Sequence, residues 1–284
     1  MIDQLIEAIE AKQNPVALCL DTTLDTMPEV FQAAFDTAQL MGAASAVIAY
    51  NKALLKALQD VVPCVKIQPA FYERLGMPGA MALAETLRLA KDMGYITFLD
   101  GRRQGSAGAD LAYAQAYLGR VTLNGRGFSA FPCDFLSVGE INEETVKIAR
   151  EYGKGMFVPL PMGGFYDAML ADGQRVYEAM AGEIEAKGRS YLGLYGYSSL
   201  GMTVHTDDCD KAKALRSRLP HTFFVTEEEA TPAVFGALDD ERGRGVMVAS
   251  ARLARAWERW NTDDFATAAR EEAYCLRETY NLHG

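Results

Sequence analysis

The chain is predicted to form one α/β domain, a (β/α)8 TIM barrel with an extra N-terminal helix. Three observations predict this fold class. Eight short apolar runs recur along the 284 residues, a helical pattern follows each run, and no Pro/Gly/Ser-rich linker divides the chain. Runs that are apolar nearly throughout indicate strands buried on both faces, as in a parallel sheet covered by helices. Eight such units match a barrel of about 250 residues, so residues 1–284 are expected to form a single domain.

A doubly wound open sheet is the alternative architecture. Dinucleotide-binding sheets of that kind carry a Gly-x-Gly-x-x-Gly sequence after the first strand, and the chain lacks this sequence there. The barrel is therefore the preferred prediction.

The predicted strands are short and rich in Val, Leu, Phe or Tyr. They cover residues 15–21, 64–68, 95–100, 120–124, 155–160, 191–195, 222–226 and 245–250. Helical periodicity predicts a first helix over residues 1–12, before the first strand. The helices predicted between and after the strands cover residues 29–60, 79–93, 110–118, 143–152, 173–187, 207–219, 231–240 and 263–280.

Capping signals support several of these helices. Asn142 and Thr262 each precede two acidic residues at a predicted helix start. Side-chain oxygens and negative charge are favourable there because the first backbone N–H groups of a helix have no partner within it. Gly94 and Gly188 mark the ends of two helices.

The charge of the chain excludes two classes of partner. There are 28 basic and 38 acidic residues, which gives a net charge of -10. Nucleic acids and anionic membrane surfaces attract basic proteins, so neither is expected to bind. The N-terminus lacks the apolar segment of a signal peptide, and no run approaches about 18 apolar residues. We therefore expect a cytoplasmic protein whose partner is a small molecule.

Neither the cysteines nor the histidines form a metal-binding pattern. The five cysteines are scattered without a Cys-x-x-Cys pair, which indicates reduced thiols. The three histidines lie far apart, without the spacing of metal ligands, so no metal ion is expected. His205 follows the sixth predicted strand, where it is either a solvated loop residue or a residue that faces the pocket.

Polar residues gather at the ends of the predicted strands, and this is the end of a barrel that carries function. Cations and carboxylates alternate there and offer many donors and acceptors to a polar ligand. The candidate site residues are Asp21, Lys66, Asp100, Arg102, Asn124, Ser250 and Arg252.

Several segments, in order along nearly the whole chain, are similar to the orotidine 5'-phosphate decarboxylase family in its long bacterial form. The most specific segment is Val65-Lys66-Ile67-Gln68-Pro69-Ala70-Phe71-Tyr72-Glu73. The others are Cys19-Leu20-Asp21, Leu99-Asp100-Gly101-Arg102-Arg103, Asp110-Leu111-Ala112-Tyr113-Ala114, Val121-Thr122-Leu123-Asn124, Leu170-Ala171-Asp172-Gly173 with Tyr177-Glu178, and Gly245-Val246-Met247-Val248-Ala249-Ser250-Ala251-Arg252.

The resemblance implies a barrel that pairs as a homodimer, with active sites at the interface and no metal or organic cofactor. It places Asp21 and Lys66 on a ribose and Asp100 near the scissile carboxylate. The family's next residues in this motif are a lysine that protonates the reacting carbon and an aspartate that crosses the interface. Their positions are occupied here by Arg102 and Gly105.

These two substitutions indicate that the ancestral proton chemistry is lost. Lysine readily shifts its pKa when buried, whereas arginine keeps its proton at any ordinary pH. Proton transfer from such a mismatched acid is inefficient. Arg102 remains able to stabilise a developing negative charge.

The resemblance also places a glycine-containing phosphate loop after strand seven, with Arg252 as the phosphate-binding arginine. The chain has Glu227-Glu228-Glu229 in place of the loop. One glutamate about 5 Å from a phosphate charge costs on the order of 3 kcal/mol at an effective dielectric constant near 20. We expect this acidic run to pair with Arg252 and close the phosphate site. Residues 160–165 likewise replace the family's base-reading loop, and Gly163-Gly164 indicates a turn or lid hinge.

Three functions are compatible with this sequence. The first is a diverged family member that has lost orotidylate decarboxylation and binds an unidentified polar, ribose-like molecule. The second is a working orotidine 5'-phosphate decarboxylase, a cofactor-independent lyase of pyrimidine metabolism. The third is a non-catalytic regulatory dimer.

Overall fold

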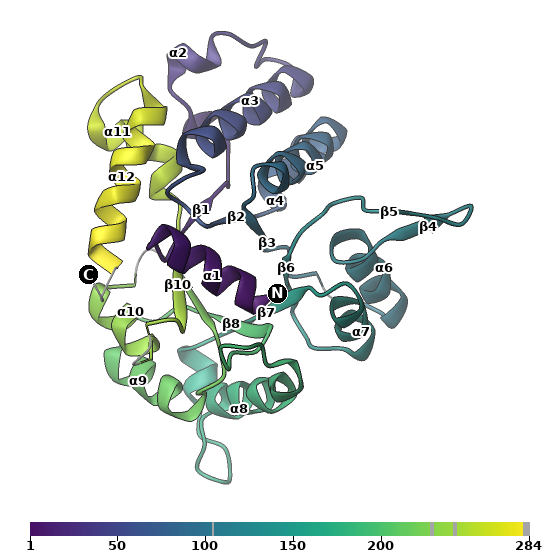
Figure 1. Ribbon diagram of the computed structural model, residues 1–284, viewed down its shortest axis with the longest axis vertical. Helices are drawn as coiled ribbons and strands as arrows, with labels where there is room; N and C mark the ends of the chain where they lie inside the picture. The colour runs from purple at the N-terminus through teal and green to yellow at the C-terminus, as the bar shows by residue number, and fades with distance from the viewer. Residues whose placement is uncertain (104, 228–229, 241–242, 281–284) are drawn as a thin grey trace.

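The computed structural model describes residues 1–103, 105–227, 230–240 and 243–280. Eight parallel strands close into a barrel in the order β1-β10-β9-β8-β7-β6-β3-β2 (Figure 1), which confirms the predicted (β/α)8 fold. The barrel strands are β1 (Val16–Cys19), β2 (Cys64–Ile67), β3 (Ile96–Leu99), β6 (Phe135–Ser137), β7 (Gly155–Leu160), β8 (Leu200–Val204), β9 (Phe224–Glu227) and β10 (Val246–Ser250).

Helices cover the outside of the barrel (Figure 1). They are α2 (Glu29–Gln32), α3 (Leu40–Leu58), α4 (Ala70–Glu73), α5 (Gly76–Asp92), α6 (Ala107–Tyr117), α7 (Glu143–Glu151), α8 (Val176–Gly188), α9 (Cys209–Arg218), α10 (Pro232–Leu238), α11 (Ala256–Trp260) and α12 (Phe265–Tyr280). The helix predicted over residues 29–60 is thus two helices. Asn142 caps α7 as predicted, since its side chain accepts from Thr145 N at 2.8 Å. None of the helices in the described ranges is long and apolar enough to span a membrane.

Helix α1 (Ile2–Lys12) closes the amino-terminal end of the barrel. Its buried residues Ile2, Leu5 and Ile6 pack in one cluster with the aromatic rings of the barrel interior. Its first N–H group donates to Ser199, which directly precedes β8. The apolar face of α1 therefore fills this end, and the carboxyl ends of the strands remain available for a site.

The prediction of a barrel strand at residues 120–124 is wrong. This segment forms β4 (Val121–Leu123), which pairs with β5 (Arg126–Phe128) in an exposed antiparallel hairpin outside the barrel. Asn124 and Gly125 have φ angles of 48° and 76°, as in the type I′ turn that Asn-Gly favours. Asn124 therefore lies in the hairpin turn, and the fourth barrel strand is β6.

The prediction of a barrel strand at residues 191–195 is also wrong. A 3-10 turn, η3 (Arg189–Tyr191), begins this segment, and the sixth barrel strand is β8. The strand contains Gly201, where an added Cβ would lie 2.5 Å from the Phe157 ring and 2.6 Å from the Phe223 carbonyl oxygen. Because Gly201 permits this close approach, a residue that usually weakens strands is required in this one.

Candidate active site

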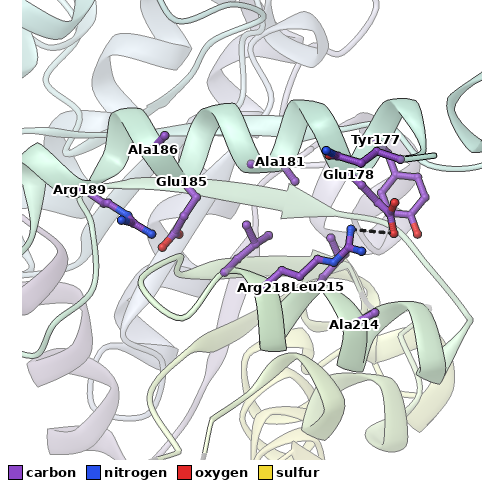
Figure 2. Close-up of a pocket in the computed structure, with 12 residues that line it drawn as sticks. Tyr177, Glu178, Ala181, Glu185, Ala186, Arg189, Ala214, Leu215 and Arg218 are labelled. Carbon is purple, nitrogen blue, oxygen red and sulfur yellow. Dashed lines mark ion pairs between the residues drawn. The ribbon is translucent and has the colours of Figure 1, made fainter. Parts of the chain in front are cut away.

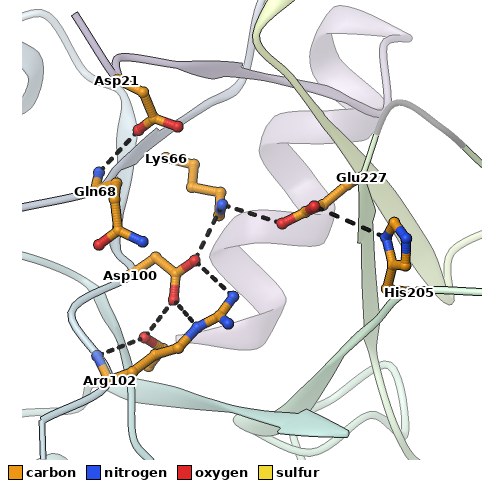
Figure 3. Close-up of polar contacts among 8 residues, drawn as sticks. Asp21, Lys66, Gln68, Asp100, Arg102, His205 and Glu227 are labelled. Atoms are coloured by element: carbon orange, nitrogen blue, oxygen red, sulfur yellow. Dashed lines mark hydrogen bonds and ion pairs between the residues drawn. The ribbon is translucent and has the colours of Figure 1, made fainter. Parts of the chain in front are cut away.

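Asp100 is the centre of a buried polar cluster at the carboxyl end of the barrel (Figure 3). Its side chain is 0% exposed and follows β3. Lys66 of β2 places Nζ 3.0 Å from Oδ2. Arg102 donates from Nε to Oδ1 at 2.8 Å and from Nη2 to Oδ2 at 3.0 Å. Ser137, at the end of β6, donates to Oδ1 at 2.6 Å. The carboxylate is therefore satisfied by three neighbouring side chains.

The charges in this cluster stabilise one another. Burial raises the pKa of Asp100, but Lys66, Arg102 and Ser137 outweigh burial, and the net pKa lies below its usual range. Hydrogen bonding to Asp100 raises the pKa of Arg102. Burial lowers the pKa of Lys66, whereas Cys19 and three nearby carboxylates raise it, and the net shift is upward. Both cations therefore keep their protons at neutral pH.

The backbone of the segment after β3 holds Arg102 against Asp100. Arg102 has a φ of 47°, in the left-handed region that side chains rarely adopt. Its N–H donates to the Ser137 hydroxyl at 3.2 Å. At the preceding Gly101, an added Cβ would lie 2.4 Å from the Tyr113 hydroxyl. The Arg102 guanidinium group therefore points back toward Asp100, directly after β3.

Asp21 follows β1 on the other side of Lys66 (Figure 3). Its Oδ1 accepts from the backbone N–H of Gln68 at 3.1 Å. Burial raises the pKa of Asp21, and the positive charge of Lys66 opposes this effect only in part. Asp21 is therefore a carboxylate whose ionised form is less well compensated than that of Asp100.

A buried hydrogen-bond chain fixes the loop that carries Asp21. Thr22 donates to Asn51 at 2.6 Å, Asn51 donates to the Tyr72 hydroxyl at 2.8 Å, and Tyr72 donates to the Leu20 carbonyl oxygen at 3.0 Å. Because all members of this chain are buried, they hold both sides of Asp21 in place.

Glu227 ends β9 and faces the cluster from the opposite side of the mouth (Figure 3). Its Oε1 lies 3.6 Å from Lys66 Nζ, and its Oε2 lies 3.9 Å from Nδ1 of His205, which directly follows β8. Glu227, His205 and Arg102 border a cavity of about 170 Å³. Its remaining lining residues are Pro159, Leu160, Pro161, Thr203 and Val204.

Ser250 ends the eighth barrel strand, β10, and Arg252 follows it, as predicted. Ser250 is buried, and its hydroxyl accepts from Arg252 N at 3.2 Å. The Arg252 guanidinium contacts Glu272 of α12, which also accepts from Arg259 at 2.8 Å. The ion pairs of Glu227 within the described residues are with Lys66 and His205. Glu228 and Glu229, the other members of the run predicted to pair with Arg252, lie outside the described residues, so that pairing stays a prediction.

Helix α12 supplies the carboxylate that contacts Arg252. It presents Glu272, whose side chain is 1% exposed and which also accepts from Trp260 at 3.2 Å. A buried carboxylate needs cationic partners, so Glu272 takes Arg252.

Comparison with curated proteins establishes the family. The chain is 30% identical over 293 residues to orotidine 5'-phosphate decarboxylase of Clostridium tetani, an alignment that covers 98% of this chain and 96% of that protein. It is 28% identical to the protein of the same name from Rhodopirellula baltica, over 94% of this chain and 91% of that one. The chain belongs to the orotidine 5'-phosphate decarboxylase family. No family model matches it.

Solved structures with this name share the fold. The orotidine monophosphate decarboxylase of Leishmania donovani has a TM-score of 0.70 and 21% identity, over 97% of this chain and 98% of that chain. The Plasmodium berghei enzyme has a TM-score of 0.75 and 9% identity, over 98% of both chains. At these identities the likeness concerns the fold alone.

Ser137 is the one residue of the cluster that sequence reasoning misses. A fourth strand predicted at residues 120–124 leaves Ser137 outside every predicted element. The apolar pair Phe135-Leu136 directly before Ser137 and the Asn-Gly turn signal at 124–125 are the sequence features that identify the correct strand in this family member.

A larger cavity of about 410 Å³ lies on the outer surface, between α8 and α9 (Figure 2). Glu178 and Arg218 form an ion pair of 3.0 Å across it. Small residues such as Ala181 and Ala214 line its walls. The candidate site residues do not line it.

Proposed function

We propose that this protein is a diverged member of the family that no longer decarboxylates orotidine 5'-phosphate. It binds a non-phosphorylated, hydroxyl-rich small molecule at the carboxyl end of the barrel. One observation carries the proposal. Arg102 stands at the position of the family's proton-donating lysine and holds both oxygens of Asp100, at 2.8 and 3.0 Å.

An arginine in this arrangement cannot perform the lysine's step. A general acid works best when its pKa lies near the operating pH. The pKa of an arginine lies above about 12, and Asp100 raises that of Arg102 further. Gly105 also lacks the carboxylate that the resemblance places at its position. Arg102, paired with Asp100, can still stabilise a developing negative charge, but it cannot deliver a proton.

The opposite side of the mouth disfavours a phosphate. Glu227 stands where the resemblance places the phosphate loop, and the arginine expected to bind phosphate, Arg252, contacts Glu272. A phosphate near β9 would lie beside the Glu227 carboxylate, which is 43% exposed. Because like charges repel strongly near a protein surface, a ligand without phosphate fits this site better.

The proposed ligand-binding residues are Asp21, Lys66 and Ser250. A carboxylate and an ammonium group beside each other accept from and donate to neighbouring hydroxyl groups of a sugar. Asn124 has no part in this proposal, since it lies in the exposed hairpin turn.

The test is decarboxylation of orotidine 5'-phosphate by the purified protein, with the Clostridium tetani relative assayed in parallel. We expect a rate lower by many orders of magnitude. Arg102→Lys, alone or with Gly105→Asp, should not restore full activity, because the phosphate loop is also replaced. A rate comparable to that of the relative would refute the proposal.

A working decarboxylase is the second candidate, and the names of the relatives favour it. A non-catalytic regulatory dimer is the third. A panel of small molecules in a thermal-shift assay separates the third from the first, because only a specific ligand stabilises the folded state by mass action.

We also expect a cytoplasmic homodimer. The exposed apolar residues Val121, Leu123 and Phe128 of the hairpin support pairing. Light scattering should give about twice the chain mass of 31.1 kDa, and a clean monomer would contradict this expectation.

A further inference from the structure

We infer that Glu227 makes the barrel mouth select a ligand that carries a protonated amino group beside its hydroxyl groups. The inference rests on the proposed function, a site for a non-phosphorylated, hydroxyl-rich molecule, and adds the charge of the ligand.

The Glu227 carboxylate has unused capacity to accept hydrogen bonds. Its two ion pairs in the described part of the chain, with Lys66 at 3.6 Å and His205 at 3.9 Å, are both longer than a hydrogen bond. An ionised carboxylate offers about four acceptor positions. The side chain is 43% exposed, so a donor from a ligand can reach it at shorter distance.

The cavity beside Glu227 fits one end of a small molecule. Its volume is about 170 Å³, smaller than the roughly 300–1,000 Å³ of pockets that enclose a whole drug-sized ligand. Its apolar lining residues are Pro159, Leu160, Pro161 and Val204. Apolar walls lower the local dielectric constant and thereby strengthen the attraction between Glu227 and a cationic group.

The five charged groups of the cluster, Asp21, Lys66, Asp100, Arg102 and Glu227, sum to one negative charge. Asp100 is engaged by Lys66 and Arg102, and Asp21 brings the sum of these four charges to zero. Glu227 then adds one negative charge. His205 is 72% exposed and can balance this charge only when protonated. A cationic group therefore complements the mouth, whereas an anionic group is repelled.

The location of Glu227 determines which part of a sugar it meets. Lys66, the proposed partner of the sugar hydroxyl groups, lies 3.6 Å from it. A ribose bound at Lys66 therefore has one end beside Glu227. The resemblance places the 5'-phosphate of the family's substrate at this end, so the selected ligand carries an amino group in the place of a phosphate.

Three probes test this inference: methyl β-D-ribofuranoside and its 5-amino-5-deoxy and 5-phosphate derivatives. They share one ring and differ in charge at a single position. Binding to the full chain is measured by NMR titration at low ionic strength. We expect the amino derivative to bind at least about 10-fold more tightly than the parent sugar, and the phosphate to bind most weakly. Added salt should reduce both differences.

Glu227→Gln removes the charge and keeps the shape of the side chain. We expect it to bring the affinities for the amino and parent sugars within about 2-fold. Glu178→Gln is the matched control, because Glu178 lies in the outer cavity and pairs with Arg218; it removes the same charge and should leave the preference unchanged. Should Glu227→Gln fail to fold, the salt dependence of the wild-type preference tests the same electrostatic origin.

The outcomes separate this inference from the proposed function. If the parent sugar binds and the amino derivative binds no more tightly, charge selection is refuted and the proposed function stands. If the phosphate binds most tightly, both are refuted. If none of the three probes binds, the hydroxyl-rich ligand of the proposed function is wrong and the inference falls with it.

Discussion

The two sides of the barrel mouth differ in how firmly their charges are held. On the side of β1, β2 and β3, Asp100 and Lys66 are 0% and 7% exposed and lie 3.0 Å apart. On the side of β8 and β9, His205 and Glu227 are 72% and 43% exposed and lie 3.9 Å apart. The first side is a packed ion-pair cluster, and the second is an open pair of titratable groups.

This difference indicates where ligand specificity can change at low cost to stability. A buried ion pair cannot lose one partner without leaving an uncompensated charge. An exposed pair contributes little to stability and tolerates replacement. Arg102 fits this view, because the resemblance implies a lysine at this position and an arginine there preserves the charge of the cluster.

Removal of Asp100 is the largest expected effect. Asp100→Ala leaves Lys66 and Arg102 without their shared carboxylate and should lower the free energy of unfolding by about 3–5 kcal/mol. Glu227→Ala is the matched control on the open side and should lower it by no more than about 1 kcal/mol. Urea unfolding measures both. Equal losses for the two variants would remove the distinction between the sides.

The second prediction concerns the strand beneath His205. Gly201→Ala forces a Cβ to within 2.5 Å of the Phe157 ring and should cost about 1–3 kcal/mol. Gly182→Ala, on α8, is the control because an added Cβ there meets nothing within 4 Å. It should stabilise the helix by roughly 0.5–1 kcal/mol. A neutral effect of Gly201→Ala would show that β8 adapts more freely than its packing suggests.

The sequence predicted the β1–β3 side better than the other, for a physical reason. Strands β1, β2 and β3 are continuous apolar runs with a charged residue in or after each, so periodicity and strand-end logic suffice. Strand β8 contains Gly201, which local propensity assigns to a loop. Only the packing of Phe157 and Phe223 against it requires glycine there, and such contacts are not visible in the sequence.

The site residues on the β1–β3 side were likewise predicted better than those on the other side. Asp21, Lys66, Asp100 and Arg102 lie together, as the strand ends implied (Figure 3). The contact between Arg252 and Glu272 joins the end of β10 to α12 and depends on how that helix docks. A pairing pattern within neighbouring loops, the basis of the predicted pair between Arg252 and residues 227–229, contains no information on this docking.

The third prediction tests the corrected position of Asn124. Asn124→Ala places a residue with a Cβ but no side-chain amide at a φ of 48° and should cost about 1 kcal/mol. The binding of methyl β-D-ribofuranosides at the mouth should not change, because the turn lies outside the barrel. A large loss of binding with intact folding would return Asn124 to the site.

The smallest expected effect distinguishes the two aspartates of the first side. Burial raises the pKa of Asp21 above its usual range, with Lys66 opposing, so its ionised form reduces stability at neutral pH. Asp21→Asn should therefore stabilise the ligand-free protein at pH 7, by about 0.5 kcal/mol. The Asn side-chain oxygen still accepts from the Gln68 N–H, so that hydrogen bond is retained.

The opposite pKa shifts of Asp21 and Asp100 predict opposite effects of the two Asn substitutions on stability at pH 7. The stability contributed by protonated Asp21 is fully present below about 3.9, the ordinary pKa for Asp, and is lost as the pH rises through the raised folded pKa. The gain from Asp21→Asn should therefore shrink as the pH falls from neutral through the folded pKa, and should be gone near the ordinary value. For Asp100 the folded pKa is lowered despite burial, because of Lys66 and Arg102. Its contribution is present above the ordinary value and is lost as the pH falls through the folded pKa. Asp100→Asn should therefore destabilise at pH 7, with a difference that narrows in acid. Urea unfolding of both variants at pH 7 measures the two signs. Repeating it at pH 4 and at about pH 2.5 measures the two pH dependences, because the change for Asp21 lies above about 3.9 and the change for Asp100 lies below it. A destabilising Asp21→Asn at pH 7 would show that Asp21 belongs to the ion-pair cluster rather than to the ligand.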